Sequence, residues 1–316
     1  MPKFDVVCGN PPYQSSTKKS NQANALWPRF FEIFANISKF DGYIQIVIPT
    51  VWMANDPDEI KSGRMTISRV RNKILSKLNI KSIVNTTKIN SLFNVGTDIC
   101  YLTLQNNDNK NENMLLITDT GSKEINQNIK FIPLNINDTI FNILNKTLLN
   151  NNKKIKIYSN PDLRFTTDTR RFKYMSFKKT KIHKYPSVNT SAQYTKKQYI
   201  WSSIPHPYQY QAKIIYSDSG YARPFYDKGK FGLNSHAHAI FIENQKQADN
   251  LIFYFNSKLV KYLESLIPTS GFATGITKII NYLPEINISR SWTNQELYEY
   301  FNLTQEEIKY IESQIK

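Results

Sequence analysis

The segment DVVCGNPPY, residues 5–13, combines residue types that suit methylation of an exocyclic amine on a nucleobase. The lone pair of such an amine is delocalised into the ring, so the nitrogen is a poor nucleophile. The side-chain oxygen of Asn10 can accept a hydrogen bond from one amine proton, and the carbonyl of Pro11 can accept the other, which localises the lone pair. Pro11 and Pro12 fix that carbonyl's direction without adding a competing donor. Because Tyr13 can stack on an unpaired base, these four residues form a candidate catalytic group.

Elements on both sides of this segment predict how it is positioned. The apolar run 4–8 stops at Gly9 and the Asn-Pro-Pro turn, which predicts a buried strand followed by an extended loop. Sites in α/β proteins lie at the carboxyl ends of such strands. Apolar periodicity predicts helices at 26–37 and 65–78 and strands at 43–49, 81–86, 98–105 and 114–118. This alternation indicates an α/β layer with a mainly parallel sheet.

A second region follows a predicted helix at 137–149 and the polar run Asn150 to Lys154. Strands are predicted at 213–217 and 236–242, a helix at 246–267, and two short helices in the last 25 residues, the second with a Thr304/Glu307 capping box. We therefore predict three parts: residues 1–150 as a catalytic half-domain, 151–290 as an α+β recognition domain, and 291–316 as a helical tail.

Composition limits the class of protein. The chain has 316 residues, 40% hydrophobic and 21% charged, which is typical of a folded globular protein. It holds no apolar run of membrane length and no signal-peptide pattern at its start. Two cysteines cannot make a disulfide framework, so a reducing cytoplasm is the expected location. Cys8 and Cys100 both lie in apolar strands and are expected in the core.

Positive charge concentrates in one stretch. Of a formal net charge of +16, residues 151–200 hold 13 basic against 2 acidic side chains, interleaved with Tyr and Phe. This pattern favours nucleic acid as a partner, although a solvated basic face or a protein partner would give the same composition. The candidate contacts are Arg164, Arg170, Arg171, Lys173, Lys178, Lys179 and Lys181.

The segment FDVVCGNPPY resembles the catalytic motif of DNA adenine-N6 methyltransferases, in particular the TaqI-like and type IIG restriction–modification branch. Similar segments follow in order along nearly the whole chain, with residues 155–235 the least specific. They are Asn24 to Trp27 with Phe30-Phe31-Glu32, GYIQIVIP with Trp52, Phe93 with VGTDICYLTL, and Tyr282-Leu283-Pro284 with SRSWTNQELYEYFNLTQEEIKYIE.

This resemblance implies part of a Rossmann-like methyltransferase sheet, S-adenosylmethionine as the methyl donor, and double-stranded DNA as the substrate. It implies that Tyr13 and Phe93 stack on a flipped adenine, although Phe93 could equally be a core residue. It also places Asp5, Asn10, Leu26 and Trp27 near the cofactor, with capping or solvation of the strand as the alternative for Asp5.

One departure from the family is large. Such enzymes carry a glycine-rich cofactor loop upstream of the catalytic motif, whereas this sequence has only 10 glycines and begins three residues before the motif. Neither Gly229-x-x-Gly232 nor Gly271-x-x-x-Gly275 is predicted at a suitable strand-to-helix turn. We therefore expect only the four strands on one side of the family's sheet, with residues 4–8 at an open edge. A second polypeptide, or a preceding segment, would complete the sheet and bring the cofactor loop.

Other functions compete with an enzyme. A catalytically inactive fragment that only recognises DNA would fit the missing loop, while the intact Asn-Pro-Pro-Tyr favours methyl transfer. A nuclease is not indicated, because Glu59-x-Lys61 and Glu307-x-Lys309 lack an upstream Pro-Asp. His236 and His238 alternate as metal ligands do on a strand, but no Cys or carboxylate stands at ligand spacing, so ordinary strand positions are expected and no metal is predicted.

Overall fold

A computed structural model describes residues 3–13, 25–54, 70–72, 74, 77–93, 98–107, 113–151, 153–162, 164–166, 174–190, 198–217, 220–221, 224–268 and 273–315. The chain forms two compact units, Met1–Asn142 with Ser265–Ser270 and Ile143–Glu264 with Gly271–Lys316. In the described part of the chain, no helix is long and apolar enough to span a membrane.

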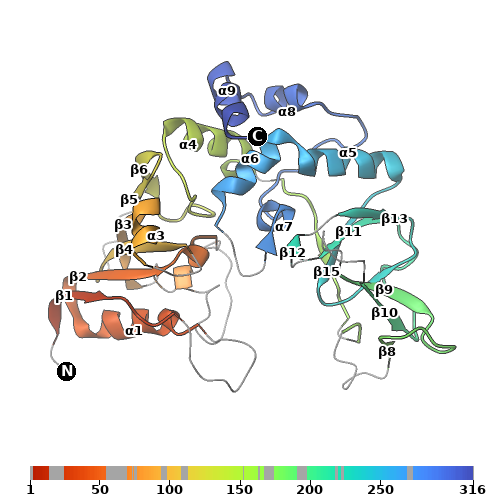
Figure 1. Ribbon diagram of the computed structural model, residues 1–316, viewed down its shortest axis with the longest axis horizontal. Coiled ribbons are helices and arrows are strands. Elements are labelled where there is room, and N and C mark those ends of the chain that lie inside the picture. Colours follow the sequence, from red (N-terminus) through yellow and green to blue (C-terminus); the bar gives the residue numbers. More distant parts are fainter. Residues whose placement is uncertain are drawn as a thin grey trace. The chain divides into compact units, whose positions relative to one another are not determined.

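Unit 1 is built on a six-stranded sheet with the order β1-β2-β4-β3-β5-β6. Its strands are Phe4–Gly9, Ser38–Pro49, Asn79–Asn85, Ile99–Gln105, Asn113–Thr118 and Gly121–Asn126, numbered β1 to β6 in chain order (Figure 1). The pairs β1–β2 and β3–β5 are parallel, while β2–β4, β3–β4 and β5–β6 are antiparallel. The expectation of a mainly parallel sheet is therefore wrong, and the sheet is mixed. Two of the antiparallel pairs arise because β4 lies between β2 and β3 and runs opposite to both. The third is β5–β6, where Asp119 and Thr120 alone join the strands, which only an antiparallel pair allows.

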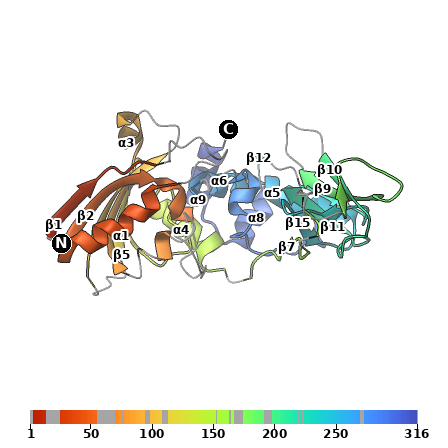
Figure 2. The same ribbon diagram turned by 90° about the horizontal axis from the view of Figure 1, so that it is seen from below.

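Apolar alternation buries one face of this sheet. Val7 of β1 lies opposite Ile44 of β2, and Ile44, Ile46 and Ile48 are fully buried. Helix α1 (Trp27–Ile37) begins with Pro28 in its first turn and runs along β1 and β2 in both views (Figures 1 and 2).

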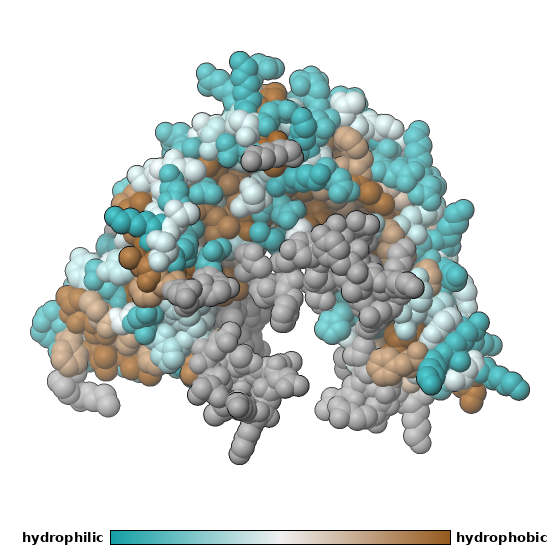
Figure 3. Space-filling view, viewed as in Figure 1, coloured by the Kyte–Doolittle hydropathy of each residue, from teal (hydrophilic) through white to brown (hydrophobic). Residues whose placement is uncertain are grey.

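The other face and the edge of β1 are open. Phe4 is 49% exposed and Val6 55% exposed, and Tyr43, which lies opposite Val6 on β2, is 42% exposed. The space-filling view shows hydrophobic side chains gathered over β1 and α1 (Figure 3). β1 is the terminal strand of the described sheet and pairs only with β2. An apolar edge with unpaired backbone groups is a surface on which another strand can add.

Connecting elements complete unit 1. A 3₁₀ helix, η1 (Thr50–Ala54), follows β2, and α3 (Thr87–Leu92) joins β3 to β4. Helix α4 (Asp138–Leu144) continues into a π-helical turn, η2 (Asn145–Leu149), in agreement with the helix predicted at 137–149. Of the helix predicted at 65–78, residues 70–72, 74 and 77 are helical and Leu78 is not, while residues 65–69, 73, 75 and 76 lie outside the described residues.

Unit 2 contains three small sheets with the orders β14-β9-β10-β8, β13-β11-β15-β7 and β12-β16. The strands are β7 (Tyr158–Ser159), β8 (Met175–Ser176), β9 (Tyr185–Thr190), β10 (Gln198–Ser202), β11 (Lys213–Ser217), β12 (Gly220–Tyr221), β13 (Phe225–Asp227), β14 (Gly232–Leu233), β15 (Ala237–Phe241) and β16 (Ala273–Thr274). Both four-stranded sheets contribute to one core, in which Val188 and Leu233 pack with Ile215, Ala237 and Ala239.

Helices follow these sheets. The single helix predicted at 246–267 is two helices, α5 (Gln245–Asn256) and α6 (Lys258–Leu266), because Ser257 is extended (φ −62°, ψ 154°) and its hydroxyl caps the turn at Val260. After α7 (Ile276–Ile279) come α8 (Asn294–Tyr300) and α9 (Gln305–Gln314). The capping box of Thr304 and Glu307 is confirmed at α9.

Candidate active site and nucleic-acid surface

The Asn-Pro-Pro-Tyr loop begins where β1 ends. Strand and helix approach closely there, because a Cβ on Gly9 would lie 2.7 Å from Cζ of Phe34 in α1. Pro11 is buried and Pro12 is exposed, so the loop is anchored by one proline while the next stays at the surface. Strands β1, β2, β3 and β5 run in the same direction. Their carboxyl ends and this loop therefore lie at the same end of the sheet, the end where these strands finish.

Asn10 is exposed, and no hydrogen bond holds its side chain within the part of the chain that the structure describes. Most side-chain amides in folded proteins find a protein partner or face water. An amide fixed at a strand end but left without a protein partner can therefore accept a hydrogen bond from a ligand amine.

Tyr13 lies beside the start of α1, because the backbone N–H of Leu26 donates to the carbonyl of Tyr13 over 3.1 Å. The ring is half-buried, and its hydroxyl oxygen is buried without a hydrogen-bond partner. Burial raises the pKa of Tyr13, so the phenol stays protonated at neutral pH. The structure thus brings together Asn10, Tyr13 and Leu26, three of the predicted site residues.

Trp27 follows Leu26 but is only 1% exposed, and its ring meets that of Phe31 edge to face at 6.1 Å. A side chain buried to this degree packs in the core beneath the loop and is not accessible to a ligand. Leu26 is half-buried and is the member of this pair that can face one.

Phe93 lies directly after α3, at the same end of the sheet as the Asn-Pro-Pro-Tyr loop. That helix is fixed by Thr86, whose hydroxyl accepts from Ile89 N–H, and by Asp119, whose carboxylate accepts from Thr87 N–H. Phe93 is half-buried, and no ring contact with Tyr13 is recorded among the described residues.

Asp5 does not join this group. It stands near the start of β1, five residues before Asn10, a distance of about 16 Å along an extended strand. Its carboxylate accepts from Lys39 Nζ at 2.8 Å, and that hydrogen bond lowers the pKa of Asp5. This exposed ion pair is the contact that the structure gives Asp5, and its proposed place near the cofactor stays a prediction.

The expectation that both cysteines are core residues is wrong for Cys8. Cys100 is buried in β4, and burial raises the pKa of its thiol to about 12. Cys8 is exposed, and its Sγ lies 3.6 Å from Oε1 of Gln45. The difference arises because Cys8 points to the open face of an edge strand.

The residues near Asn10 suit only one end of S-adenosylmethionine. The buried, unpartnered Tyr13 hydroxyl and the free Asn10 amide fit the reacting end, where polar groups must meet a cation and an amine. For the adenosine end, the described glycines offer no cradle in unit 1. Contrary to expectation, Gly275 does lie at a strand-to-helix turn, between β16 and α7, with φ 61°. However, that helix has four residues, and the turn belongs to unit 2.

The predicted basic residues have different surroundings. Arg164 is engaged by Asp162 at 2.7 Å, which lowers the pKa of Asp162, and its guanidinium lies 5.5 Å from the Tyr174 ring centre. Lys179 lies 5.3 Å from the ring centre of Trp201, and Lys178 and Lys181 are exposed. Arg170, Arg171 and Lys173 lie outside the described residues.

Further cation–aromatic pairs were missed by the sequence analysis. Lys184 lies over Tyr185 and Lys230 over Phe231, each 5.3 Å from the ring centre. Both pairs are sequence neighbours, so a search for lysine directly before an aromatic residue would have found them. A cation beside a ring offers a phosphate contact and a stacking surface at one position.

Unit 2 also buries polar groups that are structural. Lys213 and Asp227 form a 2.7 Å ion pair with both side chains buried, and the Asp227 carboxylate also accepts from the backbone N–H groups of Lys230 and Phe231. The pair thus closes the turn that follows β13. His238 lies beside Ser159, with its Nδ1 3.0 Å from the hydroxyl, at an ordinary strand position.

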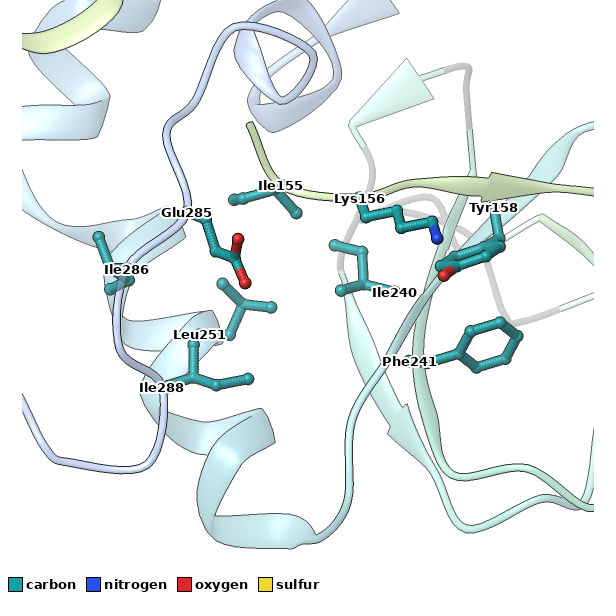
Figure 4. A pocket seen from close by; sticks show the side chains of 9 residues that line it. All are labelled: Ile155, Lys156, Tyr158, Ile240, Phe241, Leu251, Glu285, Ile286 and Ile288. Atoms are coloured by element: carbon teal, nitrogen blue, oxygen red, sulfur yellow. The ribbon is translucent and has the colours of Figure 1, made fainter. Parts of the chain in front are cut away.

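A small pocket in unit 2 has an apolar floor with one cation and one anion at its rim (Figure 4). Lys156 and Glu285 are the charged residues, and the volume is about 130 Å³. Ligand sites for drug-sized molecules measure about 300–1,000 Å³. This pocket is therefore too small for a nucleobase with its sugar, or for the methyl donor, and we assign it no part in transfer.

A family model and several solved structures are similar to parts of this chain. Residues 1–93 match the family model "Eco57I restriction-modification methylase". Among solved structures, the type IIL restriction–modification enzyme MmeI in complex with DNA is 8% identical, with 89% of this chain and 46% of that chain covered and a TM-score of 0.41.

The type IIG restriction endonuclease BpuSI is 10% identical over 94% of this chain and 49% of that chain, with a TM-score of 0.34. A putative class I S-adenosylmethionine-dependent methyltransferase from Listeria monocytogenes is 18% identical over 37% of each chain, with a TM-score of 0.28. The chain thus spans less than half the length of these structures. No curated protein matches it. The family similarity is therefore confined to residues 1–93.

Proposed function

We propose that this chain is the catalytic and DNA-recognition part of a site-specific, adenine-specific DNA methyltransferase of a restriction–modification system, with S-adenosylmethionine as the methyl donor. The observation that carries the proposal is Asn10 at the carboxyl end of β1, an exposed amide for which the described residues supply no hydrogen-bond partner, followed by a buried proline. The match of residues 1–93 to a restriction–modification methylase family supports it.

In this mechanism a flipped adenine places its 6-amino group at the loop. Asn10 Oδ1 and the carbonyl of Pro11 would accept hydrogen bonds from its two N–H groups, which leaves the nitrogen lone pair available to attack the methyl group as its bond to sulfur breaks. Tyr13 and Phe93 stack on the base, and Leu26 lies at the methionine end of the cofactor. S-adenosylmethionine supplies an electrophilic methyl group on sulfur. The amine then loses a proton to solvent through the same acceptors.

The test is transfer of labelled methyl from S-adenosylmethionine to mixed-sequence duplex DNA. Asn10→Ala removes one acceptor and should reduce transfer by about 10²–10³-fold while DNA affinity stays within about twofold. Asn256→Ala, which removes an exposed amide of α5 bonded only to Ile252, is the matched control and should transfer normally. Equal and measurable transfer by the Asn10 and Asn256 variants, with any cofactor-binding partner present, would contradict the assignment.

Recognition of DNA is proposed for residues 151–290. The seven basic residues predicted from sequence would neutralise phosphates, so replacing several of them should weaken binding and flatten its salt dependence. Lys178 and Lys181 are the first to replace, because both are exposed and neither has an ion-pair partner. A salt dependence unchanged by both replacements would place the DNA surface elsewhere.

A second polypeptide, or a further segment, is proposed to carry the cofactor-binding half of the sheet and to pair with β1. The exposed Phe4 and Val6 and the open edge of that strand support this. A methyltransferase half that holds a glycine-rich loop should raise transfer activity when added, and it should protect the outward-facing amides of β1 from hydrogen exchange. Val6→Lys should abolish both effects.

A DNA reader without transfer activity is the second candidate, favoured by the lack of a glycine cradle in unit 1. The transfer assay separates the two, because a reader binds DNA and gives no Asn10-dependent incorporation under any combination of chains.

A further inference from the structure

The connection between β8 and β9, residues 177–184, exposes two large apolar side chains. Phe177 is 62% exposed and Ile182 is 69% exposed. Four lysines surround them in the sequence FKKTKIHK, and no Asp or Glu occurs anywhere between residues 169 and 217. Single exposed apolar side chains are ordinary on a protein surface, so it is the position of these two that matters: they lie in a segment whose only charged residues are lysines.

The tip of this connection is fixed by its own hydrogen bonds. The backbone N–H of Thr180 donates to the carbonyl of His183 over 3.1 Å, and the Thr180 hydroxyl accepts from the N–H groups of Ile182 and His183. Lys181 and Ile182 are thus the two residues of a closed turn. Ile182 is presented on a preformed support, which lowers the entropy that binding must overcome.

The base of the connection is also held. The Ser176 hydroxyl accepts from Lys178 N–H at 3.2 Å, and Lys179 Nζ lies over the Trp201 ring of β10. β8 and β9 pair with opposite sides of β10, so the segment crosses that strand at Trp201. The connection is therefore held at its base by contacts with the sheet and at its exposed tip by the hydrogen bonds of its own turn.

Charge selects the partner. The ammonium groups of Lys181 and Lys184 require an anionic surface, and the apolar side chain between them requires an apolar gap within that surface. Duplex DNA offers both, since its phosphates flank base steps that an aliphatic wedge can open. An acidic membrane is the other surface of this kind, but a single short aliphatic side chain anchors weakly there.

We propose that Ile182 is an apolar wedge that enters a base step of duplex DNA, with Lys181 and Lys184 on the flanking phosphates. This inference rests on the proposed function, in that unit 2 must bind DNA. It goes further by assigning an insertion that unstacks a step and bends the duplex. Because pyrimidine–purine steps are the easiest to unstack, the wedge adds a preference for them.

The experiment selects bound duplexes from a pool with a randomised centre, using the full chain and its variants. Ile182→Ser is the test, Ile182→Leu keeps an apolar tip, and Tyr210→Asn is the control. Tyr210 is 70% exposed in the same unit, outside the basic segment, and its φ of 71° suits asparagine. Energy transfer between dyes at the ends of a selected duplex reports bending.

The wild-type chain, Ile182→Leu and Tyr210→Asn should enrich a pyrimidine–purine step at one position and bend the duplex. Ile182→Ser should lose that enrichment and the bend, and bind the selected duplex about tenfold more weakly with an unchanged salt slope. Lys181→Gln should instead reduce the slope by about one.

Each other outcome overturns a different statement. If Ile182→Ser selects and bends DNA as the wild type does, the wedge is refuted and DNA recognition stands. If the wild-type chain binds no duplex, the proposed recognition function fails together with the wedge. Ile182-dependent binding to phosphatidylserine vesicles, with no Ile182 effect on DNA, would assign the tip to a membrane and overturn the proposal.

Discussion

Lowering the pH should destabilise unit 2 through one histidine. His206 is 3% exposed, its Nδ1 accepts from the N–H of Tyr208 at 2.9 Å, and its Nε2 lies 3.0 Å from Oδ1 of Asn160. These partners fit a neutral ring with its proton on Nε2. Burial, helped by the nearby Lys213 ammonium and opposed by Asp162, lowers the pKa of His206 from 6.5 to about 4.

The sign and size follow from linkage. Between pH 6.5 and about 4 the unfolded chain holds a proton on His206 that the folded chain does not, so acid favours unfolding. The free energy of unfolding that depends on a neutral His206 is fully present above pH 6.5 and is lost as the pH falls toward 4. A shift of this size corresponds to about 3 kcal/mol in the free energy of unfolding.

The measurement is hydrogen exchange of the β11 amides between pH 7 and pH 4, corrected for intrinsic rates, because the two units need not unfold together. His206→Asn keeps an acceptor for Tyr208 and cannot take up the proton. The variant should be less stable at pH 7 but should lose about 3 kcal/mol less than the wild type on acidification. An equal loss in both chains would refute the assignment of the acid sensitivity to His206.

Three further predictions concern other residues. Asp227→Asn should cost about 3–5 kcal/mol in the stability of unit 2, because it leaves the Lys213 ammonium buried without its carboxylate; β11 exchange measures this, and a loss below about 1 kcal/mol would contradict it. Thr304→Ala should cost about 1 kcal/mol by removing the N-cap of α9, seen as faster exchange in that helix alone. Iodoacetamide should modify Cys8 in the folded chain and Cys100 only after unfolding, since the first thiol is exposed and the second buried; equal labelling rates would show that β1 is covered or β4 is open.

Elements with local signals could be predicted from the sequence. β1 and α1 carry complete apolar patterns with a stop signal, and the strand predicted at 213–217 is β11. The Thr304 box marks the start of α9 because its hydrogen bonds span only four residues. Sheet direction was not predictable in this way, because it depends on which strand pairs with which. The break at Ser257 was also hidden, since apolar residues continue at helical spacing on both sides of it.

In the candidate site, too, only the features that depend on neighbouring residues could be predicted from the sequence. Asn10 to Tyr13 are contiguous, so their chemistry can be argued from residue types alone. The ion pair of Asp5 with Lys39, the burial of Trp27 and the exposure of Cys8 all depend on where β1 lies in the sheet. A short apolar strand gives the same pattern at the centre of a sheet and at its edge, so the open edge at residues 4–8 was expected from the absent glycine-rich loop and not from the strand's own residues.

The proposed catalytic loop follows the same strand whose edge is open, so the proposed activity is linked to whatever covers that edge. Asn10 follows β1 directly, and β1 is held by β2 on one side only in the described sheet. A strand with one partner opens more readily than one with two, and misplacing a catalytic group by about 1 Å can cost about 10²-fold in rate. A partner that pairs with β1 would therefore raise activity even if it brought no cofactor-binding residue, because it would hold Asn10 in place. We expect protection of the β1 amides and the rate of methyl transfer to rise together as such a partner is added; a rate that increases while β1 remains open would show that the partner acts through the cofactor alone.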